Sequence, residues 1–391
     1  MKIALLTEVF LPKIDGITNR LRHTLRCLEA EGHECLLLAP DTAVSGHGAA
    51  RVVRIPSLPF PRYPGVRVAL PDPRIAASLA VFRPDVVHAV GPAALGAMGI
   101  AASRALGLPI VASYHTDFPR YLPGYGLGFA ERAIWPLIRA VHGAAHVNLC
   151  PSQFTKEELE EHGVRSVGIW RGGVDADLFH PRKRSLAMRL RLSGGRPEGP
   201  LLLYVGRLSP EKNLASFAEV LDLVPGARLA LVGDGPARSE LEAALAHHLA
   251  EGRVHFTGFL RGEELAEAFA SADLFVMPSK TETLGFVVLE AMASGLPVVA
   301  AHAGGLPDVV VPEENGLLHH PDRPREAAEA IRRILGDEGL RRLLARLARK
   351  TAEGASWSAE TRRLLEAYRR AIVLARQSRG ALRRFGGLLF A

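Results

Sequence analysis

Short apolar runs alternate along this chain with longer segments in which apolar residues recur at helical spacing. In the first half, the predicted strands are residues 2–6, 34–39, 85–89, 109–114 and 146–150. The predicted helices between them are residues 18–31, 93–106, 129–142 and 152–161. Ser152 stands where an N-cap is expected for the last of these helices. Alternation of this kind is typical of a parallel sheet covered by helices.

The alternation stops at residues 172–200, which are rich in Gly, Pro and charged residues and are therefore interpreted as a linker. It then restarts, with predicted strands at 201–205, 227–232, 253–257, 273–277 and 297–301. The predicted helices are 214–223, 237–250, 263–271 and 286–293, and helical sequence continues from 325 to the end. A chain of 391 residues is long for one core. We therefore expect two doubly wound α/β domains, 1–180 and 181–357, with a final helix at about 358–391.

The amino-acid composition adds no new element and serves to exclude some classes of protein. Hydrophobic residues make up 48% and charged residues 23% of the chain, which is typical of a folded protein and excludes a largely disordered one. Three cysteines without a CxxC pair argue against a disulfide framework or a zinc cluster, and favour a reducing compartment. We find no signal-peptide pattern at the start, and no apolar run approaches the ~18–20 residues that span a bilayer.

The net charge of +7 is concentrated at the end of the chain. Residues 361–391 contain eight arginines and a single acidic residue, Glu366, so this tail carries the whole excess. A balanced body argues against nucleic acid as a partner, because nucleic-acid binding needs a basic face. The tail could instead contact an anionic membrane surface.

The strongest local motif is Thr281-Glu282-Thr283-Leu284-Gly285, which follows a predicted strand and opens a helix that contains Glu290. Free amides at a helix start attract phosphate. Glu282 could accept hydrogen bonds from sugar hydroxyls, and Glu290, about two turns further, could bind a ribose diol. The alternative is a pair of ordinary exposed carboxylates, but the strand and Gly285 favour a binding role.

A second motif, Gly206-Arg207-Leu208-Ser209-Pro210-Glu211-Lys212, follows the strand at 201–205. It delivers Arg207 and Lys212 into one loop, which suits a diphosphate because Arg binds phosphate through two parallel bonds and Lys adds a compact charge. Two solvated surface cations are the alternative. A loop at the carboxyl end of a strand makes the binding role the better prediction.

The first half offers Gly16, in the loop between the first strand and first helix, and His115, which closes the strand at 109–114. Gly16 would let the backbone approach a ligand closely. His115 could polarise a hydroxyl or orient a sugar, although a lone His is more often structural. Asp175 and Asp177 resemble an acidic metal pair, but they lie in the expected linker, so we predict no metal site.

Together these motifs resemble the retaining glycosyltransferases of family 4 (group 1), which have the GT-B fold of two Rossmann-like domains facing across a cleft. The resemblance covers essentially the whole chain. It rests on the Gly16 loop, the run 114–117, Gly172-Gly173-Val174-Asp175, Gly206-Arg207 with Lys212, and Glu282 followed by Glu290. The segments 109–139 and 170–175 look closest to lipid-directed members, such as sulfoquinovosyl-diacylglycerol synthases and GDP-mannose-dependent lipid mannosyltransferases.

The resemblance implies a role for each residue. Arg207 and Lys212 would hold the diphosphate of a UDP- or GDP-sugar donor, and Glu290 would bind its ribose. Glu282, with amides around Leu284 and Gly285, would bind the donor sugar. Gly16 would lie under the phosphates, and His115 near the donor sugar and the reaction centre. Asp117 and Tyr121 are the candidate acceptor-side residues. No cofactor or metal is expected, because members of this family commonly work without one.

The resemblance also implies a hexosyltransferase that acts on a membrane lipid, held peripherally at the cytoplasmic face of the cell membrane. The last helix of a GT-B fold packs back on the first domain. Two alternatives remain open: the same donor chemistry with a soluble sugar or polysaccharide acceptor, and a sugar-nucleotide epimerase.

Overall fold

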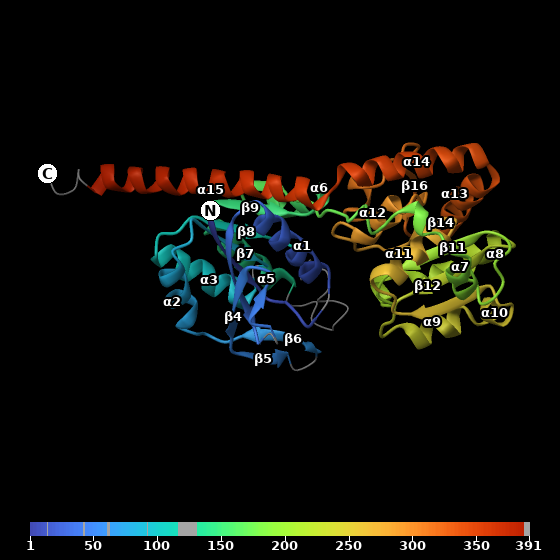
Figure 1. The fold of residues 1–391 in the computed structure, drawn as a ribbon, viewed down its shortest axis with the longest axis horizontal. Coiled ribbons are helices and arrows are strands. Elements are labelled where there is room, and N and C mark those ends of the chain that lie inside the picture. Colours follow the sequence, from blue (N-terminus) through green and yellow to red (C-terminus); the bar gives the residue numbers. More distant parts are fainter. Residues whose placement is uncertain (14, 42–43, 61–62, 92, 116–130, 387–391) are drawn as a thin grey trace. The chain divides into compact units, whose positions relative to one another are not determined.

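The computed structural model describes all residues except 14, 42–43, 61–62, 92, 116–130 and 387–391 (Figure 1). The chain forms two compact units. Unit 1 comprises Met1–Arg171 and Trp357–Ala391, and unit 2 comprises Gly172–Ser356. The chain therefore passes between the units twice, after Arg171 and after Ser356, whereas the sequence-based boundary lies at residue 180.

Unit 1 is built on an eight-stranded sheet with the order β10-β9-β8-β7-β1-β2-β4-β3. Its strands are β1 (Lys2–Thr7), β2 (Glu34–Pro40), β3 (Gly46–His47), β4 (Ala50–Ile55), β7 (Val86–Val90), β8 (Ile110–Ser113), β9 (Val147–Cys150) and β10 (Val167–Ile169). Every pairing is parallel except that of β3 with β4. A separate hairpin, β5 (Ser57–Phe60) and β6 (Tyr63–Ala69), follows β4. The central strands read as unbroken apolar runs because helices bury both of their faces.

The helices of unit 1 are α1 (Gly16–Ala30), α2 (Arg74–Phe82), α3 (Ala94–Ala105), α5 (Glu131–Gly143), α6 (Gln153–Glu161) and α15 (Trp357–Gly386). Asp15 caps α1 by accepting from the amide of Thr18 (2.9 Å), and Ser152 caps α6 as the sequence predicts. The last helix, α15, contacts α1 and the strands β7, β8 and β9. Its apolar face, with Leu364 and Tyr368, belongs to the same buried cluster as Ile3 of β1.

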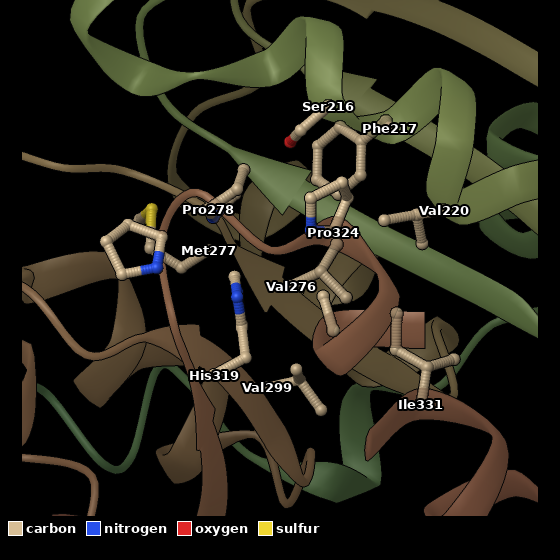
Figure 2. Close-up of a pocket in the computed structure, with 12 residues that line it drawn as sticks. Ser216, Phe217, Val220, Val276, Met277, Pro278, Val299, His319, Pro324 and Ile331 are labelled. Atoms are coloured by element: carbon tan, nitrogen blue, oxygen red, sulfur yellow. The ribbon is translucent and has the colours of Figure 1, made fainter. Parts of the chain in front are cut away.

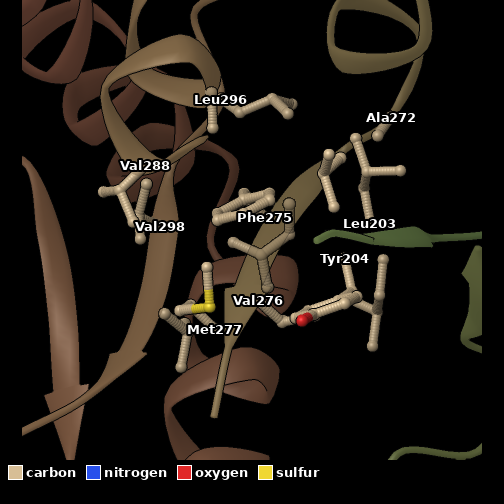
Figure 3. Close-up of a cluster of buried hydrophobic side chains, with 14 of the residues drawn as sticks. Leu203, Tyr204, Ala272, Phe275, Val276, Met277, Val288, Leu296 and Val298 are labelled. Carbon is tan, nitrogen blue, oxygen red and sulfur yellow. The ribbon is translucent and has the colours of Figure 1, made fainter. Parts of the chain in front are cut away.

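Unit 2 contains a six-stranded, fully parallel sheet with the order β13-β12-β11-β14-β15-β16. Its strands are β11 (Leu201–Val205), β12 (Arg228–Val232), β13 (Val254–Gly258), β14 (Leu274–Met277), β15 (Val298–Ala301) and β16 (Gly316–His319). Its α-helices are α7 (Leu186–Leu192), α8 (Phe217–Leu223), α9 (Arg238–Ala244), α10 (Ala246–Ala250), α11 (Gly262–Ser271), α12 (Phe286–Ala293), α13 (Pro324–Gly336) and α14 (Glu338–Gly354). Figure 3 shows its core, where Phe275 of β14 lies among side chains of β11, β15 and α12.

Both sheets confirm the predicted doubly wound architecture, and each has a point where the strand order reverses. In unit 1 the chain leaves β1 for β2 on one side and later resumes at β7 on the other. In unit 2 the same reversal separates β11 from β14. Ligands of open parallel sheets bind beyond the carboxyl strand ends at such reversals, because the connecting loops diverge there.

The interpretation of residues 172–200 as a linker is wrong. This segment belongs to unit 2 and contains α7, whose Met188 and Leu192 are buried in the core. Arg189 between them donates to the carbonyls of Pro197 and Gly199 and to Asp273. The Gly, Pro and Arg residues give the segment the composition of a linker. In the structure, however, Arg189 forms hydrogen bonds with backbone carbonyls and the few apolar residues pack in the core.

Two further segments differ from the sequence prediction. Residues 50–82, which carried no predicted element, form β4, the β5–β6 hairpin and α2. The helical sequence after residue 325 is three helices, separated by short breaks near Asp337 and Ala355. No helix among the described residues is long and apolar enough to cross a bilayer.

Candidate functional site

The Arg207 loop of unit 2 lies at the carboxyl end of β11, beside the strand reversal. The Tyr204 hydroxyl donates to the carbonyl oxygen of Arg207 (3.0 Å), and the amide of Leu208 donates to the carbonyl of Asp234 (3.1 Å). These bonds fix the backbone, while the Arg207 side chain is exposed and has no acidic partner among the described residues. A guanidinium held in this way is available to an anionic ligand.

Lys212 follows in the same loop, and its ammonium group forms an ion pair with the Glu282 carboxylate. Both side chains are largely buried, with exposed fractions of 15% and 16%. The sequence analysis assigns these residues to different parts of a donor, Lys212 to the phosphates and Glu282 to the sugar. Their contact shows that the two motifs meet in one place, so a sugar phosphate that binds there would have to share both groups.

The backbone of Glu282 is supported by the loop that follows β15. The amide of Gly305 donates to the carbonyl oxygen of Glu282 (2.7 Å). Gly304 has a left-handed φ of +55°, and a Cβ added there would lie 2.2 Å from that carbonyl oxygen. The close approach requires glycine at position 304.

Gly285 ends the Glu282 loop in a left-handed conformation (φ 85°) and serves as the N-cap of α12. Because glycine has no side chain, Gly285 makes no capping hydrogen bond to the first amides of the helix. Leu284 is buried, with 1% exposure, and its side chain belongs to the core. Any contact of Leu284 and Gly285 with a ligand would therefore be made by their backbone.

Glu290 lies on α12, and its carboxylate is partly exposed without a hydrogen-bond or ion-pair partner among the described residues. Loss of hydration in this environment raises the pKa of Glu290 from its ordinary 4.5 to about 8. A carboxylate kept without a partner costs folding energy, which is typical of a group reserved for a ligand.

In unit 1, Gly16 is the first residue of α1 and is exposed, which leaves the amino end of this helix accessible. His115 follows the carboxyl end of β8 and is 9% exposed. Neither of its ring nitrogens has a hydrogen-bond partner among the described residues. Burial, and then the charge of Arg20, holds the pKa of His115 well below its usual range, so the ring is neutral at physiological pH. Asp117 and Tyr121 lie outside the described residues.

Two further residues of unit 1, Glu8 and Arg20, were not predicted from the sequence. Glu8 follows β1 at the strand reversal of unit 1, where its carboxylate accepts from the amide of Gly96 (2.9 Å) and burial raises its pKa to about 7. An acidic residue directly after the first strand was the available signal. Arg20 is a fully buried cation on α1, and a charged residue on the buried face of an amphipathic helix was its signal.

A pocket in unit 2 lies near the carboxyl ends of β14 and β15, between α8 and α13 (Figure 2). Its walls are mostly apolar, and its polar side chains are those of Ser216 and His319. None of the predicted binding residues lines it. We therefore assign the candidate site to the charged groups around Arg207 and Glu282 and not to this pocket.

Asp175 has a local structural role, because its carboxylate accepts from the amides of Asp177 (3.2 Å) and Leu178 (3.0 Å). Within the part of the chain that the structure describes, no cluster of three His, Cys, Asp or Glu side chains could hold a metal ion.

The candidate site of unit 2 thus presents two cations, two carboxylates and an uncapped helix start beside one strand reversal. Cations and free amides suit phosphates, whereas carboxylates suit hydroxyl groups. A molecule with both kinds of group, such as a sugar joined to a nucleoside diphosphate, matches this set.

Comparison with known families gives matches over most of the chain. Residues 14–178 match the family described as glycosyltransferase family 4, and residues 192–351 match glycosyl transferases group 1. The chain is 39% identical to sulfoquinovosyl transferase SQD2 of Arabidopsis thaliana, over 90% of this chain and 70% of that protein. It is 38% identical to a GDP-mannose-dependent alpha-mannosyltransferase of Mycobacterium tuberculosis, over 94% and 96%.

A more distant relative is alpha-monoglucosyldiacylglycerol synthase of Streptococcus pneumoniae, 29% identical over 82% of this chain and 75% of that protein. Among solved structures, sucrose-phosphate synthase of Thermosynechococcus elongatus matches with a TM-score of 0.77 at 23% identity, over 95% of this chain and 99% of that one. The structural match supports a common fold.

We predict that Glu290→Gln stabilises the protein at alkaline pH. Between pH 4.5 and 8 the folded protein retains a proton on Glu290 that the unfolded chain releases, so this residue lowers stability as pH rises through that window. Thermal unfolding should show the variant more stable by on the order of 1–3 kcal/mol at pH 8.5, allowing for partial exposure, and equal to the parent near pH 4. Equal stability at both pH values would contradict a partly buried carboxyl group that has no partner among the described residues.

We predict that Gly304→Ala impairs donor binding. The added Cβ would push against the Glu282 carbonyl at 2.2 Å and displace the loop that carries its carboxylate. Calorimetry should show donor affinity reduced about tenfold or more, since a displacement near 1 Å has effects of this size. Gly336→Ala is the matched control, because nothing lies within 4 Å of its Cβ position. Unchanged affinity in a folded Gly304→Ala variant would separate this loop from the site.

Proposed function

Since the chain belongs to the family 4 glycosyltransferases of group 1, we propose that this hexosyltransferase transfers its sugar to a membrane lipid with retention of anomeric configuration. The observation that carries the proposal is the set of Arg207, Lys212, Glu282 and Glu290 beside the strand reversal of unit 2. This set fits the phosphates, ribose and hexose of a UDP- or GDP-sugar.

The proposed reaction breaks the bond between the anomeric carbon and the donor phosphate and forms one from that carbon to the acceptor oxygen. The acceptor proton passes to the leaving phosphate on the same face of the sugar. Arg207 and Lys212 stabilise the charge that develops on the departing diphosphate. Glu282 holds the hexose hydroxyls, and neutral His115 makes a hydrogen bond near the reaction centre. This account needs no protein nucleophile and no metal.

A lipid acceptor is supported by the relatives and by charge. One relative is named for a diacylglycerol product, and α15 presents an exposed row of arginines at positions 362, 369, 370 and 376. These four have no acidic partner among the described residues. The residues up to Ala375 pack one face of the helix on unit 1, but Arg376, Gln377 and Ser378 are all exposed, and the last turns extend beyond the strands (Figure 1). We propose that α15 contacts the anionic cytoplasmic face of the membrane.

The deciding experiment is a transfer screen with UDP- and GDP-hexoses, with and without a membrane lipid extract. We expect a nucleoside diphosphate and a glycolipid, with the donor's anomeric configuration visible in the NMR coupling constant of the product. Transfer only to soluble sugars would replace the lipid acceptor. Conversion of the donor without any acceptor would indicate an epimerase.

We predict that Lys212→Ala reduces transfer about 30- to 1000-fold while the fold persists, because losing one charged contact to the diphosphate costs about 2–4 kcal/mol in the transition state. Steady-state kinetics and thermal unfolding measure the two effects. Lys183→Ala is the control, since this lysine also pairs with an acid in unit 2, namely Glu263. Near-parental turnover of a folded Lys212→Ala variant would remove the residue from the mechanism.

We predict that transfer does not require a divalent metal, because Arg207 and Lys212 can neutralise the leaving diphosphate. Turnover should be unchanged after treatment with EDTA and after adding magnesium or manganese. Loss of activity in EDTA that either metal restores would overturn this prediction.

We predict reversible binding to anionic vesicles that weakens with salt. Each basic residue near an anionic surface contributes about 1 kcal/mol, so flotation should fall when Arg362, Arg369 and Arg370 become Ala, or when residues 383–391 are removed. The matched control changes Arg341, Arg346 and Lys350 of α14 to Ala, which removes the same charge from unit 2. Equal losses in both triple variants would mean that net charge, and not α15, governs binding.

A further inference from the structure

Arg20 is a charged residue in the interior of unit 1 that the proposed reaction leaves without a role. It lies on α1, close to the Gly16 end of the helix, and its side chain is 2% exposed. Burial lowers its pKa to about 9, against the opposing charge of Glu360. Replacing a buried ion pair by apolar residues is often neutral or stabilising, so core stability alone gives a weak reason for an arginine here.

The guanidinium of Arg20 fixes the indole of Trp170 in two ways. Its Nη1 donates to the backbone carbonyl of Trp170 (3.0 Å), and the planar group lies over the indole ring, 4.6 Å from the ring centroid. The first bond holds the backbone, and the second holds the side chain. A planar cation with several donors can make both contacts at once, whereas a lysine cannot.

Two histidines also contact the ring of Trp170. The ring of His115 meets the indole edge to face, with centroids 5.3 Å apart, and His88 lies at 5.4 Å. His88 is fixed through both nitrogens, by the Tyr368 hydroxyl and the Ser113 hydroxyl, each at 2.8 Å. The ring of His115 makes no such hydrogen bonds among the described residues. Its orientation there depends on packing against Trp170.

The charges around His115 come from several elements. Burial is the largest cause that lowers the pKa of His115, and the charge of Arg20, on α1, comes next. The other titratable groups around the ring are His88 on β7 and His142 on α5. His88 is itself neutral, because burial and Arg20 lower its pKa to about 3. The carboxylate of Glu360, at the start of α15, faces Arg20 and also pairs with Arg363. Among the charged groups, Arg20 therefore has the largest effect on the pKa of His115.

We propose that Arg20 is a positioning residue for His115, which it orients by holding Trp170 in place behind the imidazole. The inference rests on the proposed function, in which His115 makes a hydrogen bond near the reaction centre. Because Arg20 also keeps a proton off the ring, a substrate meets a neutral imidazole in a fixed direction. Arg20 should then affect turnover and the titration of His115, with little effect on donor affinity.

The first test uses Arg20→Met combined with Glu360→Gln, which removes both buried charges together. Arg26→Met is the control, because Arg26 is exposed on the same helix. We expect kcat to fall about 10- to 100-fold while the donor Kd stays within about threefold. The NMR signals of the His115 ring should titrate at a higher pH than in the parent, because the charge of Arg20 no longer opposes protonation. Parental kcat and parental titration in the folded double variant would overturn the proposal.

The second test remains informative if that variant does not fold. Arg20→Lys keeps the charge beside Glu360 but loses the flat contact with Trp170, and we expect kcat to fall about 5- to 20-fold. In a His115→Ala background the same substitution should have no further effect, because Arg20 acts through His115. Additive losses would overturn the proposal. The titration of the His115 ring can be measured without turnover. A protein that transfers no sugar would therefore refute the proposed function, while the titration would still test the effect of Arg20 on His115.

Discussion

The geometry of parallel strands is the constraint on which both units depend. Parallel neighbours must be joined by crossovers, so all carboxyl ends meet at one edge of each sheet. At a strand reversal the crossovers leave in opposite directions, and the edge between them stays uncovered. The Arg207 loop and the Glu282 loop flank this gap in unit 2, after β11 and β14. The same rule puts Glu8 after β1 in unit 1. Fold and site are thus consequences of one connectivity.

Ionisable groups kept out of water are the second common theme. Glu290 has no partner among the residues that the structure describes, Lys212 and Glu282 neutralise each other, and Arg20 is buried against the ring of Trp170. Each arrangement costs stability compared with an apolar core. Such costs are expected where binding needs a particular charge in a fixed place. The energy of the extensive apolar cores offsets these costs.

Much of the fold could be predicted because buried parallel strands are continuous apolar runs, and both motifs of unit 2 follow such runs directly. The errors have a physical origin too. The sequence predicts a linker where α7 forms because arginine is usually exposed to solvent. Here the Arg189 side chain instead donates hydrogen bonds to backbone carbonyls. Strand β4, which lies between β2 and the short edge strand β3, is not predicted because its exposed positions, including Arg51 and Arg54, interrupt the apolar run. The pairing of Lys212 with Glu282 joins residues far apart in sequence, which no local pattern reveals.

α1 brings these themes together in unit 1. Its amino end carries Gly16, and it contacts the chain at both points where unit 1 ends. Buried Arg20 donates to the carbonyl of Trp170, and the ring of partly exposed His23 stacks on Trp357, with the ring centroids 4.7 Å apart. In unit 2 the same two connections are joined to each other, since the amide of Val174 donates to the carbonyl of Ala355 (2.9 Å). One helix of unit 1 therefore contacts both ends of the unit 1 chain, at Trp170 and at Trp357.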